Sequence, residues 1–219
     1  DYYIPQVLSL GGEIIDEKGT FEITDKETTD ALQTLADLIN VQGYAPKIAD
    51  TANTVWNWEQ FEAGNIGMLI DGPWCVPNVI NYCDFNVGYT IVPAAQRHVT
   101  TINGSGLAVS NTTKHPKEAY LALQSLTGPA AQQILAENGR ALPSRESVRD
   151  YYYEAMSEQD GLEEAIKASL DIGIPYHVTE NFSEVSTILN SGMDAVFSGE
   201  AAAKEAAKDI QAQVDALLK

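Results

Sequence analysis

Short apolar runs of strand length alternate with helical segments in the first half of the chain, and this order constrains the fold most. Three such runs occupy residues 66–70, 87–92 and 106–110, and each is bordered by glycine, proline or polar residues. Apolar runs of this length between turn-forming residues are typical of buried β-strands. Strands that alternate with helices predict an α/β fold.

The other periodic segments are helical. Asp25 is a predicted N-cap for a helix over residues 26–40, whose apolar side chains recur on one face. Pro116 and Pro129 each stand where a helix can begin, because proline lacks the N–H that the first turn leaves unused. Further helices are expected at residues 2–10, 54–63, 75–81, 146–157, 160–171, 183–197 and 200–218. The pattern predicts an α/β chain with a helical C-terminal region.

The charge of the chain excludes several kinds of partner. Its 219 residues carry 31 acidic and 13 basic side chains, a formal net charge of −18. Such a surface repels nucleic-acid phosphates and anionic lipid headgroups, so we expect no nucleic-acid partner. No cluster of lysine and arginine offers a pocket for a strongly anionic ligand. No apolar run is long enough to predict a transmembrane helix.

Motifs for catalysis, metals and cofactors are missing from the sequence. It has no phosphate-binding glycine loop and no G-x-S-x-G element, and its three histidines share no metal-ligand spacing. We therefore expect no cofactor and no metal. A pair of carboxylates of the glycosidase type remains possible among so many acids. Cys75 and Cys83 lack zinc spacing, and both a disulfide and free thiols are open. Across a continuous helix they would be ~12 Å apart, too far to bridge.

A tetrapeptide at the end of the first predicted strand combines the side chains of a sugar pocket. Residues 66–70 are followed at once by Asp71, Gly72, Pro73 and Trp74, and ligands of open α/β sheets bind outside the carboxyl ends of strands. Trp74 offers a flat apolar face, Asp71 can accept hydrogen bonds from hydroxyls, and Gly72 allows close backbone approach. These residues suit a neutral carbohydrate. The alternative is that Trp74 packs in the core.

Other aromatic residues are ambiguous from the residues alone. Tyr176 and Phe182 flank a loop before a predicted helix, where ligand contact and packing are both open. Tyr2 and Tyr3 allow no assignment by themselves.

The stretch from Phe61 to Trp74 resembles the F-x-x-G-x-x-A-M-x-x-x-G-P-W signature of bacterial extracellular solute-binding proteins of the maltose-binding type. Three further segments resemble the family in the same order, at residues 87–93, 104–110 and 138–145. One departure is Gly67, where the family more often has alanine before methionine.

The resemblance implies a type II periplasmic-binding-protein-like fold, in which ligand binds in the cleft between two α/β lobes. By this mapping residues 1–93 and 143–219 belong to the second, C-terminal lobe, and residues 94–142 return to the first lobe. Most of the first lobe would be absent. Since Asp1 is also unlike a natural start, we expect a fragment, about the C-terminal half of the family's chain.

The resemblance also implies ligand-binding residues. Trp74 matches the family's sugar-stacking tryptophan, and Asp71 and Gly72 adjoin it. Further ligand-facing candidates implied in this way are Phe182, Tyr176 and Tyr3.

The function that the resemblance implies is that of the substrate-binding component of an ABC importer. It would bind a small neutral sugar, or a maltodextrin-like oligosaccharide, without enzymatic activity. Its partner would be an ABC permease in the membrane. It would act outside the cytoplasm, in the periplasm or as a cell-surface lipoprotein of a Gram-positive bacterium. The alternatives are a glycoside hydrolase with paired carboxylates and a structural module without a ligand site.

Overall fold

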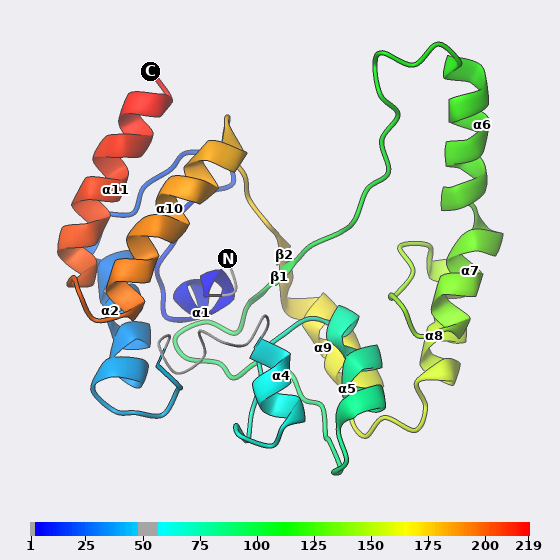
Figure 1. Cartoon of the computed structure of the whole chain (residues 1–219), viewed down its shortest axis with the longest axis horizontal. Coiled ribbons are helices and arrows are strands. Elements are labelled where there is room, and N and C mark those ends of the chain that lie inside the picture. The colour runs from blue at the N-terminus through cyan, green and yellow to red at the C-terminus, as the bar shows by residue number, and fades with distance from the viewer. Residues whose placement is uncertain (1–2, 48–56) are drawn as a thin grey trace. The chain divides into compact units, whose positions relative to one another are not determined.

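The computed structural model describes residues 3–47 and 57–219, which form two compact units (Figure 1). Unit 1 comprises Asp1–Asn57, Val92–Ile102 and Asp171–Lys219, and unit 2 comprises Trp58–Ile91 and Asn103–Leu170. Each unit has a hydrophobic core of its own. The chain therefore passes repeatedly from one unit to the other.

Three long helices build the core of unit 1. Helices α10 (Phe182–Phe197) and α11 (Ala203–Leu217) pack side by side, and both contact α2 (Lys26–Asn40) (Figure 1). Their apolar faces interlock because hydrophobic side chains recur every three to four positions. Buried residues of this core include Leu32, Val185, Leu189, Met193, Ile210 and Val214.

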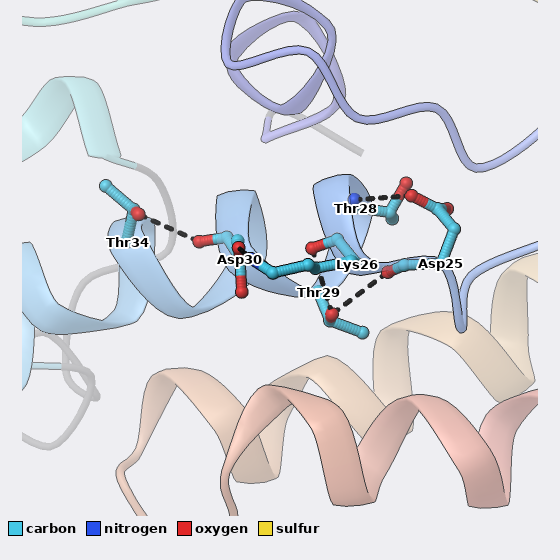
Figure 2. A network of polar contacts seen from close by, with 6 residues as sticks. All are labelled: Asp25, Lys26, Thr28, Thr29, Asp30 and Thr34. Carbon is cyan, nitrogen blue, oxygen red and sulfur yellow. Dashed lines mark hydrogen bonds and ion pairs between the residues drawn. The ribbon is translucent and has the colours of Figure 1, made fainter.

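The N-terminus of α2 is capped as the sequence predicts (Figure 2). The Asp25 carboxylate accepts a hydrogen bond from the Thr28 N–H at 2.8 Å. The Asp25 carbonyl accepts a further bond from the Thr29 hydroxyl at 2.9 Å. Lys26 and Asp30 form an ion pair one turn apart on the exposed face. The Asp25 carboxylate thereby satisfies one of the amide groups that a helix terminus otherwise leaves without a partner.

Side-chain amides connect the long helices of unit 1 to their neighbours. Gln33 on α2 accepts a hydrogen bond from the first amide of α11, that of Ala203, at 2.9 Å. Gln211 on α11 accepts from the Ile23 N–H at 3.0 Å and donates to the Phe21 carbonyl at 3.3 Å. The Gln33 amide takes the place of a cap at α11, since Ala202 has no side chain that can serve as one.

A short parallel pair of strands completes unit 1. Strand β1 (Thr100–Ile102) pairs with β2 (Gly173–Pro175), with Thr101 opposite Ile174. Helix α1 (Ile4–Ser9) packs against β1. Neither strand follows from the sequence pattern, because β1 lies in a polar stretch and β2 lies next to a predicted helix.

Unit 2 is mostly helical. Its core joins residues distant in sequence, and α7 packs against both α6 and α8. Its elements are α4 (Asn57–Glu62), η1 (Pro73–Cys75), α5 (Val76–Tyr82), α6 (Pro116–Thr127), α7 (Pro129–Glu137), η2 (Glu146–Val148), α8 (Arg149–Ala155) and α9 (Leu162–Ile172), the last of which runs into unit 1. Its core residues are Val76, Ala136, Tyr152, Leu162 and Ile166.

Most helix predictions are confirmed. The helix over 26–40 has these bounds in the structure, and Pro116 and Pro129 open α6 and α7. The prediction over 54–63 is confirmed from Asn57 to Glu62, and its first residues lie outside the described part of the chain. None of the helices formed by residues 3–47 and 57–219 is long and apolar enough to span a membrane.

The three strand predictions are wrong. Residues 66–70, 87–92 and 106–110 form no strand, and no described segment pairs with them. Residues 87–92 keep the alternation of a strand, with Val87, Tyr89 and Ile91 half-buried and the residues between them exposed. Met68 in the first segment is 88% exposed. An apolar run becomes a strand only where a neighbour pairs with it in a ladder of hydrogen bonds. The Tyr89 N–H donates to the Asp160 carbonyl at 2.8 Å, but no ladder with a described segment follows from it.

Candidate functional site

The segment after residue 70 forms a tight turn that presents Trp74. Gly72 has an extended backbone, Pro73 opens the short helix η1, and the Cys75 N–H donates a hydrogen bond to the Gly72 carbonyl at 3.1 Å. Helix α5 follows directly. Proline at the first position fixes the backbone angle that such a turn requires. Trp74 is therefore held in a defined turn by the backbone on both sides.

Trp74 is a surface residue of unit 2. Its side chain is 43% exposed, whereas Cys75 and Val76 next to it are buried. Of the two alternatives for Trp74, packing in the core is therefore not the one that the structure shows. A partly exposed indole offers apolar area to a ligand while the rest of the ring rests on the protein.

Asp71 is oriented toward its own turn. Its carboxylate accepts a hydrogen bond from the Gly72 N–H at 2.7 Å. Burial raises the pKa of the Asp71 carboxyl, while the hydrogen bonds from the Gly72 amide and from the Trp74 side chain lower it in part. The only donor of a tryptophan side chain is the indole N–H. Asp71, Gly72 and Trp74 therefore form one local group.

The other three predicted site residues come together in unit 1. The rings of Tyr176 and Phe182 meet edge to face at 5.8 Å between centroids, and the ring of Tyr3 meets Phe197 in the same way at 5.4 Å. Burial raises the pKa of Tyr3, and the neighbouring Tyr176 and Asp194 raise it further. Tyr3 and Phe182 also pack against the core of unit 1. Packing thus explains part of their placement.

A small, mostly apolar pocket in unit 1 includes Tyr176. Its polar groups come from Tyr176, His177 and Thr101. Its apolar wall is formed by Ile4, Leu8, Ile14, Ile15, Ile174 and Pro175. His177 and Thr101 have no predicted role in the sequence, because they come to line one pocket only through the pairing of β1 with β2. No signal in the sequence indicates that pairing.

The six predicted site residues thus form two groups, one in each unit. Each group is a local arrangement built by neighbouring elements of its own unit.

The cysteines and the acidic residues of the described segments form no metal site. Cys75 and Cys83 are free thiols at the two ends of α5, and burial raises the pKa of Cys75 to about 12. A thiol with such a pKa is a poor nucleophile near neutral pH. Across residues 3–47 and 57–219, no group of three or more histidine, cysteine, aspartate or glutamate side chains is arranged to hold a metal ion.

Solved structures share the fold of this chain. An ABC substrate-binding protein of Listeria monocytogenes in complex with cycloalternan matches with a TM-score of 0.89 and 20% identity, over 99% of this chain and 56% of that one. The maltose/maltodextrin-binding domain of Bdellovibrio bacteriovorus bound to maltotriose matches with a TM-score of 0.82 and 21% identity, over 99% and 57%. The GacH receptor of Streptomyces glaucescens, solved unliganded and with acarbose, matches with a TM-score of 0.81 and 23% identity, over 99% and 56%.

The chain spans little more than half the length of these structures. Their similarity confirms the predicted fold class, that of periplasmic-binding proteins. A comparison with curated proteins found no match.

A comparison of the sequence with family models agrees with the structural similarity. Residues 1–133 match the model of the bacterial extracellular solute-binding proteins. This match covers more than half of the 219 residues and includes the turn that carries Trp74. The resemblance stated from the sequence is thereby confirmed. The chain belongs to the bacterial extracellular solute-binding proteins.

Proposed function

We propose that this chain is part of the substrate-binding component of an ABC importer that takes up a neutral oligosaccharide. The observation that carries the proposal is the exposed Trp74 ring, held at the end of a family signature in a turn that begins with Asp71 and Gly72. An indole face stacks on the C–H face of a sugar ring, which is apolar although the ring edge is rich in hydroxyls. Trp74 would therefore be an anchor for the sugar.

Similar structures support a sugar as the ligand. The proteins of Listeria monocytogenes, Bdellovibrio bacteriovorus and Streptomyces glaucescens are described with cycloalternan, maltotriose and acarbose respectively. Each of these ligands contains several sugar or sugar-like rings. We take maltotriose as the probe for this chain because it is a neutral oligosaccharide and is bound in one of the similar structures.

The charge of the chain supports a neutral ligand. At −18 overall, the protein would disfavour an anionic sugar unless basic groups surrounded the site. The groups adjoining Trp74 include the carboxylate of Asp71 and, near Cys75, the carboxylate of Glu62. These carboxylates would repel a phosphorylated or carboxylated sugar bound at Trp74.

In the proposed function the protein binds the sugar and does not convert it. The family is one of solute-binding proteins, and one oxygen of the Asp71 carboxylate already accepts a hydrogen bond from its own turn. The residues of the second group, Tyr3, Tyr176 and Phe182, are proposed as further sugar contacts. A permease in the membrane is the proposed partner, because proteins of this fold are described as ABC substrate-binding proteins.

Calorimetric titration with a matched panel of sugars tests the proposal. The protein as its organism produces it is titrated with maltotriose, glucose 6-phosphate and glucuronate. We expect heat of binding for maltotriose alone, and maltotriose recovered unchanged by chromatography. Binding of the anionic sugars only would contradict the neutral-ligand proposal. Release of glucose or maltose would favour the glycoside hydrolase.

A further inference from the structure

The ring of Trp74 lies against the backbone of Gly72. A Cβ added to Gly72 would be 2.2 Å from both Cη2 and Cζ3 of Trp74, and 2.5 Å from Cε3. Three successive ring atoms at such similar distances place the added atom over the face of the six-membered ring, because an approach at the ring edge would leave Cε3 much farther away. One face of the Trp74 ring therefore rests on the bare Cα of Gly72.

The backbone of Gly72 does not itself require glycine. Its φ of −100° and ψ of 169° lie in the extended region that any residue adopts. The absence of a side chain is required by the Trp74 ring, since contacts below 3 Å would force that ring to move. Gly72 thus differs from a glycine that serves a left-handed turn.

The polar edge of Trp74 faces Asp71. The Asp71 carboxylate accepts a hydrogen bond from the Gly72 N–H at 2.7 Å, and the neighbouring Trp74 side chain lowers the pKa of the Asp71 carboxyl. The carboxylate thereby holds the peptide on which the ring rests and lies close to the indole. Hydrogen bonds to a charged acceptor are among the stronger ones in proteins.

We propose that Asp71 and Gly72 are positioning residues that clamp the Trp74 ring in the ligand-free protein, and that they act on sugar through Trp74 rather than by touching it. This inference rests on the proposed function of Trp74 as a sugar anchor. The clamp uses one ring face and the indole N–H inside the protein. Trp74 then offers a ligand only its second, apolar face. It selects for the C–H face of a sugar and gives no hydrogen bond to a hydroxyl.

The clamp assigns both residues a role different from the one that the sequence suggests. The chemistry of Asp71 alone indicates a hydroxyl acceptor, and that of Gly72 alone indicates room for a ligand. In the structure the carboxylate is committed to its own turn and the space above Gly72 is filled by Trp74. A ring held in place before binding costs less ordering entropy when the sugar arrives.

NMR of the indole groups in the ligand-free protein tests the clamp directly. The indole cross-peak of Trp74 is identified as the one lost in Trp74→Phe. In Asp71→Ala we expect this N–H to shift and to exchange with solvent about tenfold faster, because a charge-assisted hydrogen bond is lost. Asp71→Asn keeps an acceptor, so the exchange rate of its indole N–H should stay within about twofold of the wild-type rate.

Gly72→Ala tests the ring face, and Gly67→Ala is its matched control. A Cβ at Gly67 meets nothing within 4 Å, so this variant should leave the Trp74 cross-peak unchanged. Gly72→Ala should shift the Trp74 cross-peak, because the added Cβ forces the ring to move. If Gly72→Ala does not fold, as seen by circular dichroism, Asp71→Ala still decides the question. An unchanged indole exchange rate in Asp71→Ala would overturn the clamp.

Titration with maltotriose adds the functional readout. We expect the affinity to fall about fivefold in Asp71→Ala and to be retained in Asp71→Asn, because a less ordered ring must be fixed on binding. A loss of affinity in Asp71→Ala with an unchanged indole signal would overturn the clamp and make Asp71 a direct sugar ligand. Wild-type affinity in Trp74→Ala would contradict the proposed function, while the ligand-free spectra would still decide the clamp.

Discussion

Two tyrosines of unit 2 bury their hydroxyl groups where no described residue offers a hydrogen bond. The hydroxyls of Tyr89 and Tyr152 are both inaccessible, and Tyr152 is completely buried in the core. Burial raises the pKa of Tyr152 to about 12, so the phenol stays neutral. A buried hydroxyl without a partner loses its hydration and gains nothing in return. The ring of Tyr152 stabilises unit 2, whereas its hydroxyl does not.

The substitutions Tyr152→Phe and Tyr152→Ala should therefore differ widely. Phenylalanine keeps the ring, so we expect the free energy of unfolding to stay within about 0.5 kcal/mol of the wild type or to increase. Alanine leaves a cavity and should cost about 3–5 kcal/mol. Denaturant unfolding measures both. Tyr151→Phe, at the exposed neighbouring position, gives the baseline for removing a hydroxyl. A loss above ~1 kcal/mol in Tyr152→Phe alone would show that the hydroxyl has a partner.

The types of residue at Asp71, Gly72 and Trp74 predict a turn at this place, but they do not predict the contacts within it. The composition of that turn is visible in the sequence, and so is its place after an apolar run. The hydrogen bond from Gly72 to Asp71 and the ring of Trp74 over Gly72 depend on side-chain directions, which spacing alone does not determine.

Helices and strands differ in how far the sequence predicted them. The helix over 26–40 was predicted with its N-cap because its signals are local: Asp25 before it and an apolar face within it. A strand depends on a partner elsewhere in the chain. Residues 66–70 have a strand-like composition but no described strand partner, whereas β1, three β-branched residues within a polar stretch, has one.

The cap of α2 gives a prediction at the scale of the element. Asp25→Ala removes the acceptor for the Thr28 amide, so we expect a loss of about 1 kcal/mol in the free energy of unfolding. Asp30→Ala is the control, because its ion pair with Lys26 is exposed and should contribute less than about 0.5 kcal/mol. Equal losses in the two variants, measured by denaturant unfolding, would argue against the cap.

At the scale of the whole molecule, the family and fold class were predictable because they rest on a long signature. The segment from Phe61 to Trp74 lies within the 133 residues that match the family model. The lobe boundaries that the resemblance implies, residues 1–93 with 143–219 against 94–142, stay a prediction. The two aromatic groups belong to different units, and their joint use in sugar binding is part of the proposal.

Calorimetry of maltotriose binding to the wild type and to Trp74→Ala tests the central claim most directly. The claim is that the exposed face of Trp74 anchors a neutral sugar. We predict that Trp74→Ala loses about 2 kcal/mol of binding free energy, roughly a thirtyfold weaker affinity, while its circular dichroism stays that of the wild type. An affinity equal to that of the wild type in a folded Trp74→Ala protein would contradict the account.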